Sequence, residues 1–230
     1  MVLMKAAPKA PIQAVAFDID GTLYSQTLFN IIVVPHFVKN LRFFLKYNKV
    51  RHILHRTAVL PDFFEYQARL LAERLDCSSE EAHELIRSRV YDGLIPLFRI
   101  VRPYPHVLET FQVFKDRNLK LGLLSDFPPE QKGDVWGTAP LCDVILGSEK
   151  IGALKPSAYT FGTLAGELGI PAENILYVGN SKRSDVQGAK AAGMQTAWKM
   201  PLWRAILHLS YGEADLSFWN YRTLQRYVLK

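Results

Sequence analysis

The chain has 230 residues, 49% of them hydrophobic and 22% charged, which suits one large domain or a core with a smaller second unit. Its longest apolar run, residues 28–34, is far short of the roughly 20 residues that a membrane-spanning helix needs. The N-terminus lacks the apolar segment of a signal peptide, and Cys77 and Cys142 lack metal-ligand spacing, so we expect a cytoplasmic protein with reduced thiols.

The formal net charge of +6 is compatible with an acidic partner, whether a phosphorylated metabolite, an anionic membrane or a nucleic acid. The charge is unevenly placed, because residues 21–61 contain no Asp or Glu. The basic side chains of this segment include Lys39, Arg42, Lys46, Lys49, Arg51 and Arg56. Net charge alone does not choose among these partners.

The first chemical signal is AVAFDIDGTLY, residues 14–24, where an apolar run ends in Asp18 and Asp20. The apolar residues predict a short buried strand, and Gly21 marks the point where it turns. Side chains alternate along a strand, so the two carboxylates point to the same side, about 7 Å apart. A simple turn also uses Asp and Gly, but the second acid and Thr22 favour a functional pair.

About a hundred residues separate this strand from the next predicted one, far more than a crossover with one helix requires. They must contain an inserted unit, and its pattern is helical. Apolar spacing predicts helices over 35–46 and 62–75, and a third over 78–93 with a capping box between Ser78 and Glu81. Residues 105–118 predict a helix that leads back to the sheet.

The first inserted helix also carries a basic stripe with aromatic residues interleaved. Its members are Lys39, Arg42, Lys46 and Lys49, with Phe43 and Tyr47 between them. Such a helix could lie on an anionic membrane or a nucleic-acid backbone, so a binding module with a vestigial catalytic pair is the contrasting hypothesis. We favour the simpler interpretation, which is a solvated helix face.

The remaining pattern alternates strands and helices. Further strands are predicted over 119–126, 144–148, 175–180 and 195–199, with helices over 157–168 and 184–192 between them. The segment 214–218 is compatible with a final edge strand. This alternation predicts an α/β fold, a parallel sheet with helices on both faces, whose ligand lies beyond the carboxyl ends of the strands.

Four segments together resemble the haloacid dehalogenase-like superfamily. They are FDIDGT at 17–22, LLSD at 123–126, GALKPSAYTF at 152–161 and VGNSKRSDVQGAKAAGM at 178–194. Phosphohydrolases of this superfamily carry DxDGT on the first strand, Ser or Thr ending the second, a later Lys, and acids after the last core strand. DxDGT alone is moderately specific, whereas all four segments in order are a strong signal.

The resemblance covers residues 14–199 and implies a domain organisation. A Rossmann-like catalytic core would comprise residues 1–24 and 101–230. A helical cap, residues 25–100, would be inserted between the first two core strands, close over the site and select the substrate. The sequence does not identify that substrate.

The resemblance also implies a role for each matching residue. Asp18 would be the nucleophile that forms an aspartyl phosphate, and Asp20 the general acid and then the general base. Ser125 and Lys155 would hold the phosphoryl group, with Lys155 neutralising charge. Thr22 would fix the approach of Asp20 or the phosphate, or would simply stabilise the turn.

Asp126, which follows Ser125, completes the residues that we assign to substrate binding. Mg²⁺ is the expected cofactor, because the implied ligands are hard oxygens. Those ligands would be Asp18, the backbone carbonyl of Asp20, Asn180 and Asp185. The superfamily's usual first acid after the glycine is Asn180 here, so one ligand charge is missing.

The residue at position 20 also bears on the subclass. Dehalogenases of this superfamily carry an aromatic residue where this chain has Asp20, and they need no acid to protonate an alcohol. We therefore expect a phosphatase acting on a small phosphorylated metabolite such as a sugar, nucleotide or organic acid phosphate. A phosphomutase uses the same nucleophile and acid and stays open.

The C-terminal tail, rich in Trp, Tyr and Leu, leaves the oligomeric state open between a monomer and a homodimer. Residues 201–230 would complete the core or would build a dimer contact. The six histidines form no pair resembling a metal site or a catalytic triad, so we interpret them as packing or surface residues.

Overall fold

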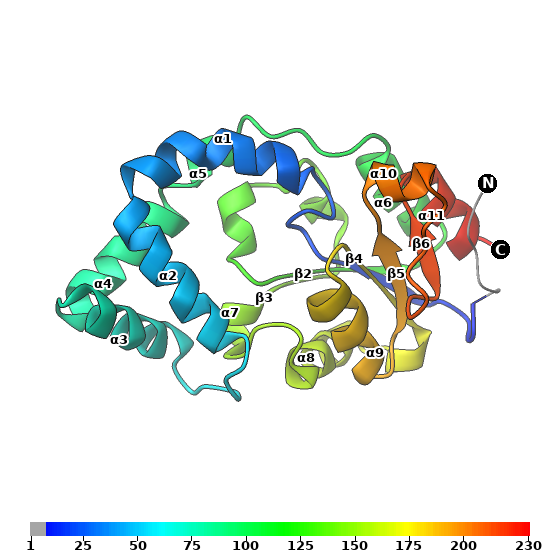
Figure 1. The fold of residues 1–230 in the computed structure, drawn as a ribbon. Coiled ribbons are helices and arrows are strands. Elements are labelled where there is room, and N and C mark those ends of the chain that lie inside the picture. The colour runs from blue at the N-terminus through cyan, green and yellow to red at the C-terminus, as the bar shows by residue number, and fades with distance from the viewer. Residues whose placement is uncertain (1–7) are drawn as a thin grey trace.

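Six parallel strands form one sheet in the computed structural model, which describes residues 8–230 (Figure 1). The strand order is β3-β2-β1-β4-β5-β6. The strands are β1 (Ala14–Phe17), β2 (Lys120–Ser125), β3 (Val144–Gly147), β4 (Ile175–Gly179), β5 (Gln195–Lys199) and β6 (Leu216–Phe218). The five strands and the α/β class predicted from the sequence are confirmed, and residues 214–218 do contain the strand at the edge.

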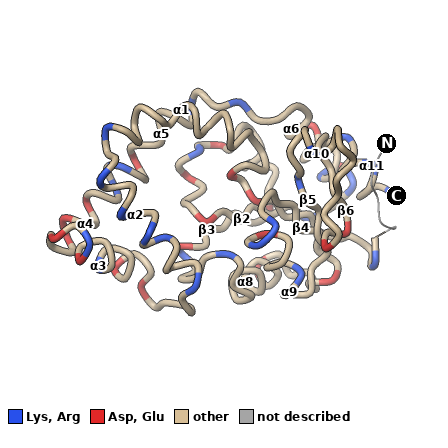
Figure 2. The backbone as a smooth tube through the Cα atoms, in the orientation of Figure 1, with Lys and Arg blue, Asp and Glu red and all other residues tan. Residues whose placement is uncertain are grey.

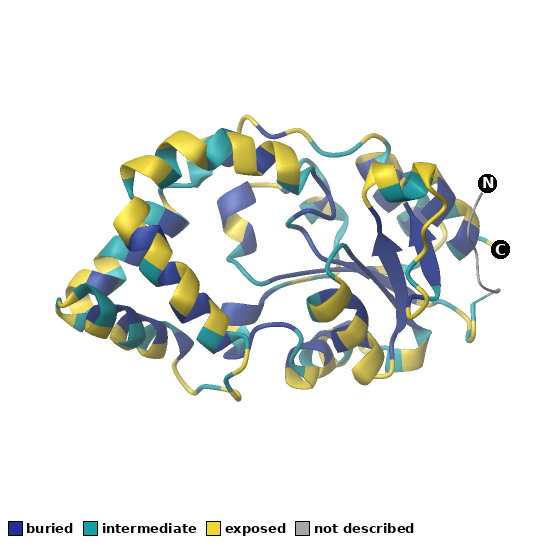
Figure 3. Ribbon diagram, in the orientation of Figure 1, coloured by how far each residue is buried: buried dark blue, intermediate teal, exposed yellow. Residues whose placement is uncertain are grey.

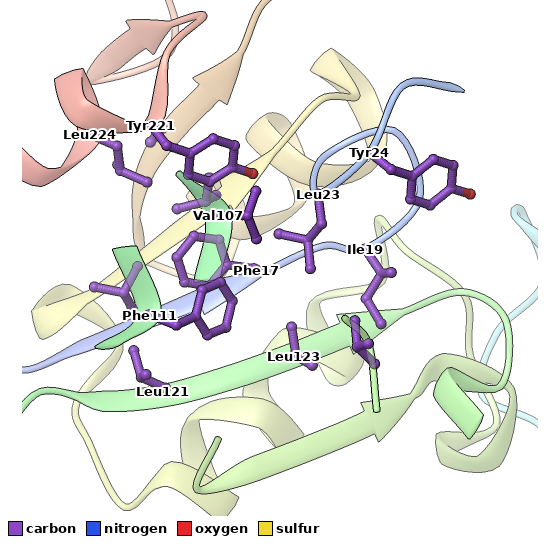
Figure 4. Packing of buried hydrophobic residues seen from close by; sticks show 14 of the residues in the cluster. Phe17, Ile19, Leu23, Tyr24, Val107, Phe111, Leu121, Leu123, Tyr221 and Leu224 are labelled. Carbon is purple, nitrogen blue, oxygen red and sulfur yellow. The ribbon is translucent and has the colours of Figure 1, made fainter. Parts of the chain in front are cut away.

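Helices cover both faces of the sheet because its strands are apolar on both sides. Val15 and Phe17 pack toward α6 (Val107–Asp116) and α11 (Tyr221–Val228), whereas Ala14 and Ala16 pack toward α8 (Ala158–Leu168) and α9 (Gly188–Ala191). Figure 4 shows the first of these layers, where Phe17 stacks on Phe111 with ring centroids 4.4 Å apart. The core helices are α6 (Val107–Asp116), α7 (Ser148–Ile151), α8 (Ala158–Leu168), α9 (Gly188–Ala191), α10 (Leu202–Ile206) and α11 (Tyr221–Val228).

The insertion between β1 and β2 is helical, as the sequence indicates. Its α-helices are α1 (Gln26–Lys39), α2 (Leu41–Leu54), α3 (Phe63–Leu75), α4 (Ser79–Ile86) and α5 (Ile95–Phe98). The capping box of α4 is present, since Ser78 accepts from the Glu81 amide and Glu81 accepts from the Ser78 amide. A π-helical segment, Arg87–Tyr91, continues α4. Helices α2, α3 and α4 share a hydrophobic core of their own, around Tyr47 and Leu71.

The predicted helix over 35–46 is wrong in its boundaries. Helix α1 begins nine residues before Pro35, where the Ser25 side chain caps it by accepting from the Leu28 amide, and it runs through the exposed Pro35. Asn40 ends it by donating its backbone N–H to His36, and α2 leaves at 117° to α1. Proline removes one backbone donor, which a long helix tolerates when the ring faces solvent.

The basic stripe is therefore divided between two helices. Lys39 ends α1, whereas Arg42, Lys46 and Lys49 belong to α2, and the interleaved Phe43 and Tyr47 are buried. Within residues 8–230, no single helix has both the length and the hydropathy of a membrane span. The pair α1 and α2 reaches that length and hydropathy only when the two bent helices are counted together.

Short 3-10 and π-helical segments complete the described structure. The 3-10 segments are Pro129–Lys132 (η2), Ala139–Leu141 and Ala172–Asn174, and a second π-helical segment is Lys182–Gln187 (η5). The predicted helix over 184–192 thus consists of η5 followed by α9. The division into residues 1–24, 25–100 and 101–230 stays a prediction. Two residues of the predicted cap pack on the core, because Phe29 of α1 stacks on Phe98 of α5 and both belong to the hydrophobic cluster that contains β1 residues.

Candidate active site

The carboxyl ends of β1, β2 and β4 lie side by side in the sheet, and the polar residues that follow them meet there. Asp18 follows β1, Ser125 ends β2 and Asn180 follows β4. Lys155 reaches the same edge from the loop before α8. The fold thus brings together residues that are up to 162 positions apart in the chain, as the sequence predicts.

Asp18 is almost fully buried, and each of its carboxylate oxygens accepts a hydrogen bond. Lys155 Nζ donates to Oδ1 over 2.7 Å, and Thr22 Oγ1 donates to Oδ2 over 2.7 Å. Burial raises the pKa of Asp18 to about 7, against the opposing charge of Lys155 and with the neighbouring acids Asp185 and Asp20 adding to the rise. Lys155 therefore favours the ionised form of Asp18.

Lys155 lies between two buried carboxylates. Its Nζ donates to Asp18 and, over 2.8 Å, to Asp185 Oδ1, and it also contacts the hydroxyl of Tyr177 at 3.2 Å. Burial acts to lower the pKa of Lys155, but Asp18 and Asp185 outweigh it and hold that pKa well above its usual value. A charged ammonium group is thereby fixed at the carboxyl end of β1.

Asp20 has a different environment from Asp18. Tyr24 donates to its Oδ1 over 2.7 Å, while Ser125 and Lys132 donate to its Oδ2 over 2.9 and 3.0 Å. Burial acts to raise the pKa of Asp20, but Lys132 and the hydrogen bonds from Tyr24 and Ser125 bring it below the ordinary value. The two acids thus have pKa values shifted in opposite directions.

Two glycines allow the loops at this edge to approach one another. Gly21 has a φ of +86°, and a Cβ there would lie 2.2 Å from Nδ2 of Asn180. A Cβ at Gly179 would lie 2.3 Å from Cβ of Asp185. A larger residue at Gly179 would displace the segment that carries Asp185, whereas one at Gly21 would move the Asn180 side chain and strain a backbone with positive φ.

Hard oxygen atoms collect around the hydroxyl of Thr22. It donates to Asp18 Oδ2 and lies 3.4 Å from Oδ1 of Asn180. Both carboxylate oxygens of Asp185 already accept hydrogen bonds, Oδ1 from Lys155 and Oδ2 from the Ser181 amide. Among the described residues, no three His, Cys, Asp or Glu side chains converge as a metal site. A cation at this edge would therefore depend on neutral oxygens as well as on carboxylates.

The family model of the haloacid dehalogenase-like hydrolases matches residues 12–193, which include every segment of this edge. The chain belongs to this family. The resemblance inferred from the sequence is confirmed, and so is the class of enzyme, a phosphoric monoester hydrolase of the haloacid dehalogenase-like superfamily.

Two curated relatives of this hydrolase are phosphatases. A glyceraldehyde 3-phosphate phosphatase of Methanocaldococcus jannaschii is 26% identical over 203 residues, covering 80% of this chain and 83% of the relative. A phosphoglycolate phosphatase of Haemophilus influenzae is 29% identical over 119 residues, covering 50% of this chain and 48% of the relative. The first similarity extends through both the core and the insertion, whereas the second covers half of each chain.

Among solved structures, a 2-haloacid dehalogenase from Pseudomonas syringae superposes with a TM-score of 0.69 at 19% identity, covering 95% of this chain and 98% of that one. This similarity concerns the fold alone. The haloacid dehalogenase-like fold thus extends over 95% of this chain.

Sequence reasoning missed two partners of Asp20 in this hydrolase. Lys132, whose side chain is 0% exposed, arrives from η2 and also lies 5.0 Å from the ring centroid of Phe98. Tyr24, four residues after Asp20, carried a weak signal in its spacing. Lys132 carried none, because it lies in a short 3-10 segment outside the four segments that carry the resemblance.

Asp126 lies at the edge of the site, where its Oδ1 accepts from the Lys155 amide over 3.0 Å. This contact orients the backbone of Lys155, and the assignment of Asp126 to substrate binding stays a prediction. The carbonyl of Asp126 accepts from Arg51 of α2, and Arg51 forms a buried ion pair with Glu149 of α7. Helix α2 is thereby connected to the core beside the loop that follows β2.

Proposed function

We propose that this hydrolase cleaves a small phosphate monoester with Mg²⁺, through an aspartyl-phosphate intermediate. The observation that carries the proposal is the environment of Asp18, whose two oxygens contact Lys155 and Thr22 while Asp20 lies two residues away with its own partners. A nucleophilic carboxylate must be ionised and close to cationic donors, and the residue that transfers the proton needs a pKa set by a different environment.

In the first half of the reaction, an Asp18 oxygen attacks phosphorus and the bond from phosphorus to the alcohol oxygen breaks. Asp20 gives its proton to the departing alcohol. Lys155, already beside Asp18, balances the negative charge of the phosphoryl oxygens as they approach. Ser125 donates to a phosphoryl oxygen after exchanging its present partner, Asp20.

In the second half, water attacks phosphorus and the bond between Asp18 and phosphorus breaks. Asp20, now a carboxylate, accepts the proton from that water. Lys132, Tyr24 and Ser125 favour this ionised form of Asp20. Inorganic phosphate leaves and Asp18 returns as a carboxylate.

Mg²⁺ fits the donor set of hard oxygens, with Asp18, the carbonyl of Asp20, Asn180 and Asp185 as the residues that would hold it. When bound, it would neutralise phosphate charge and orient the ester for in-line attack. The contacts of Asp185 with Lys155 and Ser181 favour a role for Asp185 through water or through Lys155.

A three-carbon sugar phosphate or a related organic acid phosphate is the substrate class that we propose. Support comes from the glyceraldehyde 3-phosphate phosphatase that matches over 80% of the chain. A phosphomutase would use the same two acids, but both curated relatives described above are named phosphatases. The expected cytoplasmic location remains a prediction.

A substrate screen tests the proposed function. We expect release of inorganic phosphate from glyceraldehyde 3-phosphate, phosphoglycolate or a related ester, dependent on Mg²⁺ and abolished by a chelator. Asp18→Asn should lose turnover while keeping the native circular dichroism spectrum, because an amide cannot form the phosphoenzyme. Turnover that persists in Asp18→Asn, or none on any ester including 4-nitrophenyl phosphate, would refute the proposal.

The metal assignment gives a second prediction. If Asn180 ligates Mg²⁺, Asn180→Asp adds a charge and should lower the Kd for Mg²⁺ severalfold. Binding can be followed without substrate by tryptophan fluorescence, because Trp198 Nε1 donates to the carbonyl of Asn180 over 2.8 Å. Lys190→Gln, at an exposed lysine of α9 outside the ligand set and the cavity lining, serves as the control. An unmoved Kd in Asn180→Asp would exclude Asn180 as a ligand.

A second candidate function, contact with an anionic membrane, is favoured by the outer face of α1 together with α10. Figure 3 shows exposed positions along both helices, and large apolar side chains are among them. They are Leu28, Ile31, Val34 and Val38 on α1, and Leu202, Trp203 and Ile206 on α10. Exposed apolar residues flanked by basic ones are typical of proteins that lie on anionic lipid.

A further inference from the structure

A cavity of about 690 Å³ opens beside the catalytic loops, on the side of β5. Its walls include Gly21, which follows Asp20, and Asn180, which follows β4. The segment from Trp198 to Arg204 forms the opposite wall, and the hydrogen bond from Trp198 to the Asn180 carbonyl joins the two walls. The mechanism proposed above uses none of the residues on this second wall.

The charged residues that line the cavity are all basic. They are Lys182, Arg183, Lys199 and Arg204. Within residues 8–230, none of these four side chains forms an ion pair with a carboxylate. Three of them lie over aromatic rings instead: Lys182 over Tyr211, Arg204 over Trp203 and Lys199 over Tyr104. Figure 2 marks basic positions at the end of β5 and in the segment after β4.

Lys199 is the unusual member of this group, because it is only 6% exposed. It ends β5, its Nζ lies 4.1 Å from the ring centroid of Tyr104, and among the described residues it has no hydrogen-bond acceptor. Burial lowers the pKa of Lys199 to about 8. Because Lys199 lines the cavity and has no acceptor among the described residues, an anion in the cavity would give its ammonium group a charge-assisted hydrogen bond.

A second, smaller cavity of about 410 Å³ meets the first at Lys199. Its lining is largely apolar and includes Leu202, Trp203 and Trp219. Lys199 thus stands where a polar, cationic space adjoins an apolar one. This arrangement suits a ligand that carries an anionic group on an aliphatic or aromatic body.

We propose that these adjoining cavities form a second anion-binding site, in which Lys199 and Arg204 receive a phosphate or carboxylate group. Lys182 and Arg183, which are exposed, add positive charge at the entrance. The anion belongs either to the far end of a substrate or to a separate small molecule. The site is defined by residues outside the catalytic set, so its existence does not depend on the proposed phosphatase reaction.

Direct binding tests the site. Inorganic phosphate is titrated against the full chain without Mg²⁺ and followed by tryptophan fluorescence, since Trp198 and Trp203 line the cavity. Lys199→Met, which keeps the length and packing of the side chain, should raise the Kd at least about tenfold. Lys190→Met, the same change at an exposed lysine of α9 that donates to the Glu213 carbonyl, should leave the Kd unchanged.

A second variant protects the test from a folding defect at Lys199. Arg204→Gln changes a partly exposed side chain and should also weaken phosphate binding severalfold. Native circular dichroism spectra and melting temperatures establish that the variants are folded. If Lys199→Met is folded and binds phosphate as tightly as the native chain, the second anion site is refuted. If Lys199→Met does not fold, the same result with Arg204→Gln refutes the site.

Kinetics then identify the source of the anion. Phosphoglycolate carries a carboxylate in addition to its phosphate, whereas 4-nitrophenyl phosphate carries a single anionic group. If the site receives the far end of a substrate, the ratio of KM for phosphoglycolate to KM for 4-nitrophenyl phosphate should rise at least about tenfold in Lys199→Met. If the ratio stays as in the native chain while phosphate binding weakens, the anion is a separate molecule. Because binding and kinetics are measured apart, an inactive enzyme would not be mistaken for a missing site.

Discussion

Asp18 and Asp20 are two residues apart, yet their surroundings separate their chemistry. Asp18 is buried against Lys155, and its pKa is raised to about 7. Asp20 accepts three hydrogen bonds, one of them from a buried ammonium group, and its pKa is lowered. In the proposed reaction Asp18 attacks as a carboxylate, the form that Lys155 favours against burial, and the lowered pKa of Asp20 favours the carboxylate that accepts a proton from water in the second half-reaction.

Lys132 is the residue whose removal tests this separation. Lys132→Met leaves Asp20 with Tyr24 and Ser125 as partners, and loss of the positive charge should raise the pKa of Asp20. Asp20 is the base in the second half-reaction, so the acidic limb of the pH–rate profile should move to higher pH. At a fixed pH below that limb, kcat should fall by up to about 10²–10⁴.

Lys150→Met is the matched control for this prediction. Lys150 is exposed and forms an ion pair with Glu130, which is two residues from Lys132, and Lys150 does not contact Asp20. The Lys150→Met variant should keep the native pH–rate profile. If Lys132→Met lowers the rate with the profile unmoved, Lys132 supports the fold of the site and does not tune Asp20.

Some site residues could be predicted because they lie in a recognisable motif or directly after a predicted strand, whereas Lys132 could not. Asp18, Asp20 and Thr22 stand in one short motif, and Ser125 and Asn180 follow predicted strands, so their meeting could be inferred from the parallel sheet. Lys132 lies in a 3-10 segment after β2 with no periodicity around it. Only the folded path of that segment brings it to Asp20, and the sequence carries no local sign of this path.

At the scale of elements, the strands were predictable and the start of the insertion was not. Continuous apolar runs bounded by Asp, Asn or Gly mark β1, β2 and β4 clearly. Residues 26–54 are apolar or basic almost throughout, so their periodicity does not reveal the break at Asn40. Helix α1 ends where the backbone N–H of Asn40 donates to the carbonyls of His36 and Phe37, and the residue pattern does not predict these contacts.

The contact between α2 and α7 gives a prediction at this scale. Arg51 and Glu149 are both buried, and Arg51 also lies 4.4 Å from the ring centroid of Phe127. Arg51→Met leaves the carboxylate of Glu149 buried and without its cation. The free energy of unfolding, measured by urea denaturation, should fall by about 3–5 kcal/mol.

Two companion variants show whether that loss belongs to the ion pair. Arg42→Met, on the exposed side of α2, should change the free energy of unfolding by no more than about 0.5 kcal/mol. Arg51→Met combined with Glu149→Leu should recover much of the loss, because no unpaired charge remains. Equal stability of Arg51→Met and Arg42→Met would mean that this ion pair does not stabilise the folded chain.

For the whole molecule, α1 and α10 lie along the same upper edge in Figure 1, one from the insertion and one from the core. The cavity beside Asn180 joins them, since Gln26 and Thr27 of α1 and Trp203 of α10 line it. The first turn of α1 and helix α10 therefore border the candidate ligand site. Anionic lipid that binds at α1 and α10 would therefore also lie next to the basic cavity.

The last prediction concerns this face, and the proposed occupant is an anionic lipid surface. The chain should cosediment with vesicles containing phosphatidylglycerol and much less with vesicles of phosphatidylcholine alone, and high salt should weaken binding. Ile31→Ser and Ile206→Ser remove side chains that are 64% and 66% exposed, and each should lower the partition coefficient about tenfold. Tyr159→Ser, on α8 at the opposite edge in Figure 1, should have no effect. Vesicle binding that is absent, or unchanged by both isoleucine variants, would refute the proposal; a concentration-dependent dimer in light scattering, abolished by the same variants, would assign the face to a second copy of the chain instead.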